Sequence, residues 1–247
     1  MKKIIYLSLI VPLFLFSCKS EPVAEFMVDN VKPEVGSPVA FTNQSEGATR
    51  YEWDFGDGYG SDEANPVHYF TATGKYDVIL TAYSKSDLSS QATITIEVLV
   101  PTLLVIEVVE YYQEVVVPNA SVRLYPTKPD WIAETKLVDE GTSDANGVVV
   151  FSHLANDDYF VDVWETGHDN YLLASESEGY IKINNVYPNR INWFVAWVDK
   201  ATHSKGQGKS GASYEIIRIE RKFKDMPASP YTESDWKALY EKSIKAK

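Results

Sequence analysis

Apolar and polar residues alternate along long stretches of this 247-residue chain. Tyr51, Trp53 and Phe55 share one face of an extended segment, and the acidic residues between them share the other. Residues 92–98 repeat the pattern, with Ala, Ile, Ile and Val alternating with Thr, Thr and Glu. This period of two predicts half-buried strands of antiparallel sheets. Turn residues separate the strands at roughly 8–12-residue spacing, which favours a β-sandwich.

Pro101 separates this region from a second all-β unit. In residues 191–198, both alternating sets are apolar, so we expect a strand that is buried on both faces. A further strand at 214–222 is expected to pair with it. The other strands of the unit are predicted at 103–111, 121–126, 148–152, 159–165 and 180–184.

The chain changes to a helical pattern only near its end. Thr232 and Asp235 have the spacing of a capping box, which marks the start of a helix. Its expected apolar stripe contains Trp236, Leu239, Tyr240 and Ile244.

The N-terminus has the features of a secretory signal. Lys2 and Lys3 precede an apolar run, residues 4–16, that is short for a membrane span. The sequence Leu-Phe-Ser-Cys at 15–18 resembles the cleavage box of bacterial lipoproteins. The resemblance implies that residues 1–17 are removed, that Cys18 is the lipid attachment site, and that the protein is anchored to the cell envelope, at the outer membrane or cell surface. The alternative is an ordinary signal peptide that leaves a stray thiol.

Composition narrows the possible functions. Cys18 is the only cysteine, which excludes an internal disulfide and any site with several cysteine ligands. Without Lys2 and Lys3, the mature chain has 21 basic and 35 acidic residues. Such a charge repels nucleic acid, so we exclude nucleic-acid binding. We expect no cofactor.

Residues 26–83 resemble a PKD (polycystic kidney disease) repeat, an immunoglobulin-like β-sandwich of extracellular proteins. The resemblance depends on the runs VAFTNQS (39–45), YEWDFGDG (51–58), NPVH (65–68), GKYDV (74–78) and LT (80–81). It implies that Trp53 is core and His68 is structural. Asp54 and Asp57 are then turn and capping acids, because Asp side chains bond nearby backbone in tight turns. A calcium site at these acids is the weaker alternative, since no full loop of regularly spaced ligands is present.

Most of residues 103–165 resembles the transthyretin-like sandwich of carboxypeptidase regulatory domains. The runs that carry this resemblance are VPNASVRLY (117–125), TSDANGVVVF (142–151) and YFVDV (159–163). The fold class expected is therefore all-β, with two consecutive immunoglobulin-like or transthyretin-like β-sandwiches and a short C-terminal α-helix. The expected layout is signal peptide 1–17, tether 18–24, first sandwich 25–100, second sandwich 101–225 and helix 226–247.

Candidate chemistry is sparse. No Ser-His-Asp set can be assembled, the four histidines lack zinc spacing, and we name no catalytic or metal-binding residue. Asp139, Glu140, Asp144 and Asn146 could hold calcium, although a solvated acidic loop is the simpler interpretation.

Two aromatic residues are candidate ligand contacts. Trp131 follows the turn-like Lys128-Pro-Asp and is expected to be exposed, and Tyr59 follows the tight turn. The alternative for each is a core position. The sequence thus favours a non-catalytic envelope protein that binds a glycan or a protein. A structural subunit or spacer of an envelope assembly is the alternative, and an enzyme is the third hypothesis.

Replacing Cys18 tests the anchor. The Cys18→Ala protein should be released from the membrane fraction, because a single cysteine carries the whole lipid attachment. Fractionation of cells with detergent-free washing measures this, and unchanged membrane retention would contradict the lipoprotein hypothesis.

Overall fold

The structure is a computed structural model that describes residues 20–202, 213–214 and 224–245. Its contacts divide the chain into two compact units, and each is described by itself. The first unit ends at Glu97 and the second begins at Val98. The second also takes in two short segments, Lys32–Ser37 and Phe70–Gly74. The predicted signal peptide and Cys18 lie outside the described residues.

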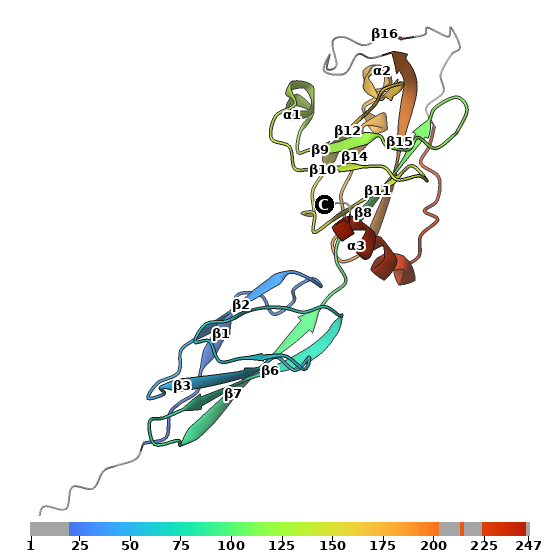
Figure 1. The fold of residues 1–247 in the computed structure, drawn as a ribbon. Helices are drawn as coiled ribbons and strands as arrows, with labels where there is room; N and C mark the ends of the chain where they lie inside the picture. Colours follow the sequence, from blue (N-terminus) through green and yellow to red (C-terminus); the bar gives the residue numbers. More distant parts are fainter. Residues whose placement is uncertain (1–19, 203–212, 215–223, 246–247) are drawn as a thin grey trace, which may run out of the picture. The chain divides into compact units, whose positions relative to one another are not determined.

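The first unit is a sandwich of two sheets (Figure 1). The three-stranded sheet has the order β1 (Phe26–Val28), β2 (Pro38–Asn43), β5 (Val67–Tyr69). The four-stranded sheet has the order β4 (Gly60–Ser61), β3 (Arg50–Asp54), β6 (Gly74–Tyr83), β7 (Ser89–Val98). Part of the expected tether belongs to the fold, since Val23 exchanges two backbone hydrogen bonds of 2.9 Å with Glu46.

The alternating pattern fills the core between these sheets, as predicted. Trp53 is buried while Glu52 and Asp54, its neighbours in β3, are exposed. The ring of Phe26 meets that of Trp53 edge-on at 5.0 Å, and the ring of Phe41 lies 5.6 Å from it. The core of the first unit is therefore an aromatic cluster centred on Trp53.

The second unit contains one continuous path of strands. The order is β10 (Asp139–Thr142), β9 (Ser121–Tyr125), β12 (Tyr159–Glu165), β13 (His168–Asp169), β15 (Ile191–Thr202), β8 (Leu103–Glu110), β11 (Val148–Ser152). In addition, β14 (Lys182–Ile183) pairs with β12, and β16 (Ser213–Tyr214) pairs with β15. The strand predicted at 180–184 is present in shortened form as β14, and Tyr180 instead belongs to the 3-10 turn η1 (Glu178–Tyr180). Of the strand predicted at 214–222, only Tyr214 lies among the described residues.

The two ends of this path face one another across a common core, to which β8, β9, β11, β12, β14 and β15 all contribute. The predicted burial of residues 191–198 on both faces is confirmed. Phe194, Ala196 and Val198 enter the core, whereas Val195 and Trp197 face outwards. This outer face is covered by α2 (Tyr171–Glu176), η1 and α3 (Trp236–Lys245).

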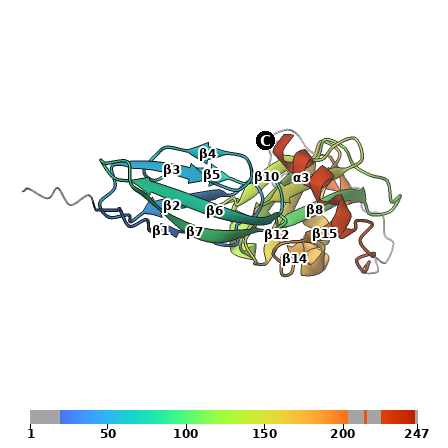
Figure 2. The ribbon, with the colours of Figure 1, turned by 90° about the horizontal axis from the view of Figure 1, so that it is seen from below.

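Helix α3 follows the short turn η2 (Glu233–Asp235) and packs across the outer face of β8 and β11 (Figure 2). The predicted capping box is present, since the Asp235 carboxylate accepts hydrogen bonds from the Thr232 N–H at 2.7 Å and hydroxyl at 2.8 Å. The predicted position of Ile244 in the stripe is wrong, because its side chain is 54% exposed. Ser243 is buried in its place, seven residues after Trp236, and donates to the carbonyl of Tyr240 at 2.7 Å.

Candidate functional site

The acids after β3 are turn acids, as predicted. The Asp54 carboxylate accepts from the Gly56 N–H at 2.9 Å, and that of Asp57 accepts from the Tyr59 N–H at 3.2 Å. Gly56 has a φ of +78°, and a Cβ there would lie 2.9 Å from the carbonyl oxygen of Asp77. Both carboxylates are therefore occupied in shaping a turn that requires glycine.

The second oxygen of Asp57 holds His68. His68 Nε2 lies 2.8 Å from Asp57 Oδ2, and the Phe55 ring stacks on the imidazole at 4.0 Å with 3° between the planes. Both side chains are mostly buried, at 13% and 12% exposure. His68 therefore fixes the turn to β5, as the family resemblance implied. Tyr59 next to it is 67% exposed, which leaves its predicted ligand contact as a prediction.

The acids near β10 are also paired within the protein. The Asp144 carboxylate accepts from the backbone N–H of Asn146 and Val148 at 2.9 Å, and its other oxygen contacts Lys242 Nζ at 2.5 Å. Burial raises the pKa of Asp144, but these bonds outweigh it and hold the pKa below its usual value. The carboxylate of Glu140 lies 3.3 Å from Nε of Arg123. Within the part of the chain that the structure describes, no group of three or more His, Cys, Asp or Glu side chains could hold a metal ion.

The expected exposure of Trp131 is wrong. Lys128-Pro-Asp begins the helix α1 (Lys128–Ala133) rather than a turn, because Thr127 caps it and accepts from the Asp130 N–H at 3.2 Å. The next position then faces the sheet, so Trp131 is 6% exposed and its indole N–H donates to the Val161 carbonyl at 3.0 Å.

The surroundings of α1 are structural as well. The hydrogen bond from Thr127 holds the pKa of Asp130 below its usual value, and the Thr135 hydroxyl donates to the same carboxylate at 3.2 Å. The Tyr171 ring meets that of Trp131 edge-on, with 6.2 Å between the ring centres. Burial raises the pKa of the Tyr171 phenol. Trp131 therefore packs α1 and α2 onto the sheet.

A pocket of about 430 Å³ lies elsewhere in the second unit, between β14, β15 and the segment that follows Lys224. Its volume is in the range of small-ligand sites. Its wall combines apolar and polar side chains, which are Ile183, Trp193, Phe194, Met226, Lys182, Asn184 and Ser229.

The segment that forms one wall is held by Lys224. Its ammonium lies 4.6 Å from the ring centre of Tyr111 and 4.5 Å from that of Trp197, and it meets Glu114 at 2.7 Å. Such cation–π contacts are stronger when the cation is partly desolvated, and the Lys224 side chain is 25% exposed. Met226, two residues later, is thus held at the pocket.

The polar rim of the pocket offers groups that a ligand can use. Asn184 is exposed, and among the described residues its side-chain amide makes no hydrogen bond. Lys182 Nζ meets Asp158 at 2.9 Å, and this bond raises the pKa of the lysine. A donor, an acceptor and an ion pair therefore surround an apolar wall, which suits a ligand with hydroxyl groups and an apolar face.

Sequence analysis missed this pocket. It placed Trp193 correctly in a buried strand, but Lys182, Asn184 and Met226 are distant in sequence and belong to no motif. Residues 200–224 contain seven Lys or Arg and two Glu, and most of them lie outside the described residues. No helix in the described ranges has the length and apolar character needed to cross a membrane.

Comparisons with known proteins identify the first unit. A family model described as the PKD domain matches residues 19–100, so this part of the chain is a PKD domain, as the resemblance predicted. None of the curated proteins matches the chain. The transthyretin-like resemblance of the second unit stays a prediction.

Solved structures give similar matches. The PKD1 domain of the Vibrio cholerae metalloprotease PrtV is 34% identical, with 32% of this chain and 98% of that chain covered and a TM-score of 0.29. The PKD1 domain of Vibrio anguillarum Epp is 33% identical, with 33% and 98% covered and a TM-score of 0.30. BcpA, the major pilin subunit of Bacillus cereus, is 11% identical over 72% of this chain and 70% of that chain, with a TM-score of 0.38.

The turn is tested by comparing a core residue with a turn acid. Trp53→Ala should destabilise the first unit by about 3–5 kcal/mol, since it empties the aromatic core. Asp57→Asn should cost about 1 kcal/mol through a weakened bond to His68. Urea unfolding measures both, and equal losses, or calcium-dependent melting of the unmodified protein, would instead indicate a metal site.

Trp131→Ala should destabilise the second unit by about 3–5 kcal/mol, because it removes a buried ring and one of the two side-chain hydrogen bonds that the Val161 carbonyl accepts. Ile132→Ala, a neighbour in α1 that is 60% exposed, is the matched control and should be close to neutral. Thermal melting measures the difference. An unchanged melting temperature for Trp131→Ala would contradict the buried role of this residue.

Proposed function

We propose that the chain is a lipid-anchored, non-catalytic protein of the cell envelope whose second unit binds an extracellular glycan. The observation that carries the proposal is the pocket beside Trp193, where an apolar wall adjoins the amide of Asn184, which makes no hydrogen bond to the described residues. Sugar rings present an apolar C–H face that packs on indole, and their hydroxyls require donors and acceptors at its edge. The Asn184 amide can donate and accept, and the Lys182 ammonium is a further donor.

The sequence supports the location. A secretory signal ending in Leu-Phe-Ser-Cys at residues 15–18 leads into a PKD domain, a fold whose named relatives include domains of a Vibrio protease. An acyl chain on Cys18 would hold the pocket close to a membrane, where a weak ligand contact gains from high local concentration.

A structural role is the second candidate, and the outer face of the three-stranded sheet favours it. Met27, Val67 and Tyr69 are each more than half exposed there. Tyr69 pairs with Pro38, and Met27 pairs with Thr42, so these side chains point away from the core of the sandwich. An exposed apolar face of this kind is typical of contact surfaces.

Glycan binding is tested with the full chain on an array of immobilised polysaccharides, followed by calorimetry on the ligand that binds best. Asn184→Ala should weaken binding about tenfold with an unchanged melting temperature, because it removes an exposed amide that makes no hydrogen bond to the described residues. Tyr59→Ala is the control in the first unit and should leave the affinity unchanged.

Three outcomes would contradict the proposal. Loss of binding in Tyr59→Ala but not in Asn184→Ala would move the site to the first unit. Absence of binding to every glycan, together with association that depends on Met27 or Tyr69, would favour the structural role. Turnover of a bound glycan would overturn the non-catalytic assignment.

A further inference from the structure

The outer edge of β7 is the most open backbone in the first unit. β7 forms a hairpin with β6, and two side-chain bonds fix the register: Gln91 to Thr81 at 3.0 Å and Thr95 to Asp77 at 2.6 Å. At the turn, the Ser84 N–H donates to the Leu88 carbonyl at 2.8 Å.

This register determines which backbone groups face outwards. Hydrogen-bonded and non-bonded pairs alternate in an antiparallel ladder. Since Ser84 and Leu88 form a bonded pair, the even-numbered residues of β7 bond to β6 and the odd-numbered residues point away from it. Glu97 agrees with this assignment, because its N–H donates to the Val31 carbonyl, outside the sheet, at 2.9 Å.

The segment at Val31 bonds to the backbone only at the end of β7, and the Ala24 N–H nearer the turn donates to the side chain of Ser90 at 2.7 Å rather than to the backbone. Nearer the turn, the outward residues are Ser89, Gln91, Thr93 and Thr95. Among the described residues, no backbone hydrogen bond satisfies their outward N–H and carbonyl groups. The stretch therefore presents a row of unpaired groups about seven residues long, enough to pair with another strand.

The sequence of this edge lacks the usual protection against pairing. Residues 89–96 contain no charge, no proline and no glycine, in a chain where 23% of residues are charged. Natural proteins block exposed edges with lysine, proline or bulges. An unprotected edge of this length indicates a strand that is kept available for pairing.

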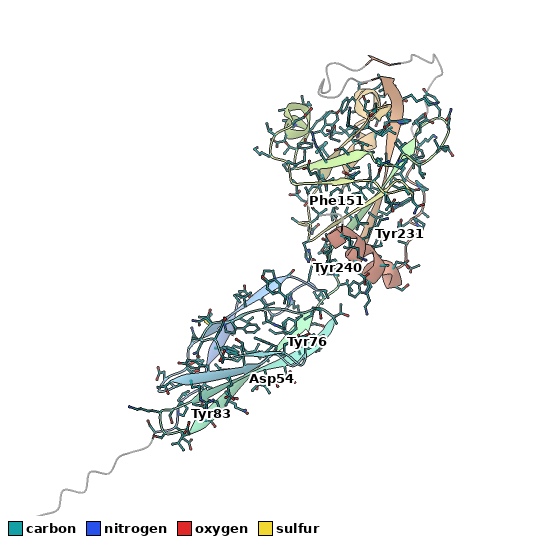
Figure 3. All side chains as sticks on the ribbon, viewed as in Figure 1. Asp54, Tyr76, Tyr83, Phe151, Tyr231 and Tyr240 are labelled. Carbon is teal, nitrogen blue, oxygen red and sulfur yellow. The ribbon has the colours of Figure 1, made fainter. Side chains whose placement is uncertain are left out.

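The surface beside the edge is acidic. The pairing of β3 with β6 places Glu52 and Asp54 on the exposed face that also carries Asp77 (Asp54 is labelled in Figure 3). Arg50 on this face is already engaged, because its guanidinium meets Glu52 and lies 3.6 Å from the ring centre of Tyr83. Lys75 lies on the same face of β6 as Asp77, so these three acids face two basic residues and the face is net acidic. Residues 25–97 contain twelve acidic and four basic residues, so a second copy would bring the same charge.

We propose that the open edge of β7, residues 89–95, accepts an extended basic segment of another protein as an added strand. Main-chain hydrogen bonds to Gln91, Thr93 and their neighbours hold the segment. Alternate side chains of the segment point to opposite faces. Its long lysine or arginine side chains extend across Thr95 of β7 towards Asp77 on β6, and its small apolar side chains lie beside the half-buried Ala92 and Ile94. This surface belongs to the PKD domain and is separate from the pocket of the second unit.

The test uses the full chain and two synthetic peptides of about ten residues, one alternating Lys with Val and the other Glu with Val. The Lys peptide should bind at least about tenfold more tightly, with an affinity that falls as salt rises. Amide hydrogen exchange should show new protection at Gln91, Thr93 and Thr95 on binding.

Thr93→Pro removes one outward N–H without removing a bond to β6, so the sandwich should fold and peptide binding should fall by about tenfold or more. Thr93→Val keeps the N–H and is the matched control, expected to bind within about twofold of the unmodified protein. Circular dichroism checks that the proline variant is folded. If it unfolds, new exchange protection of the β7 edge in the unmodified chain is the result that tests the proposal.

Equal affinity for the two peptides, or unchanged protection at the edge, would overturn the proposal. Self-association of the chain that Thr93→Pro abolishes, without binding of the Lys peptide, would also overturn it, because the occupant would then be a second copy.

Discussion

The second unit depends on the parallel pairing of β8 with β15, a strand pair that is apolar on both faces. Leu103 pairs with Ile191 and the register continues to Glu110 and Val198. A sheet that is apolar on one face can leave the other to water, but this pair requires a layer on each side. The sandwich core supplies one layer, and α2, η1 and α3 supply the other. Tyr231 and Tyr240, labelled in Figure 3, also belong to the second layer, because they pack against the apolar residues of β8, β11 and α3. The C-terminal segment is therefore part of the core, and the pocket beside Trp193 exists only because that segment returns to the sheet.

In the first unit, the inner faces of the two sheets pack on each other around the aromatic rings beside Trp53. Among its described residues, no helix adds a further layer. The outer faces and one edge stay open as a result. The WDFGDG turn contributes rigidity rather than chemistry, since the oxygens of Asp54 and Asp57 are used within the turn and by His68. The two units thus offer different surfaces, with open backbone on the first and a lined pocket on the second.

Features set by neighbouring residues were predictable from the sequence, and features set by distant residues were not. The alternation in β3 and β7, the capping box before α3 and the two-sided burial of β15 all followed from local patterns. Trp131 was misplaced because Thr127 and Pro129 can begin a helix as well as a turn, and only packing against Val161 decides between them. Ile244 was predicted to be buried, but the buried position is one residue earlier, where the small Ser243 fits against the sheet. The pocket joins β14, β15 and the segment after Lys224, and no spacing in the sequence relates them.

The acidic residues show the same dependence on contacts that are distant in sequence. Many of the acids that attract attention in the sequence are already bonded, including Asp57 to His68, Asp130 to Thr127 and Asp144 to Lys242. A carboxylate bonded in this way helps to fix the fold. Among the polar groups that make no hydrogen bond to the described residues are the amide of Asn184 and the outward backbone of β7. Backbone and amide groups recognise shape and hydrogen-bonding pattern, and they supply neither a nucleophile nor a general base. These groups therefore suit the recognition that we propose for the two surfaces.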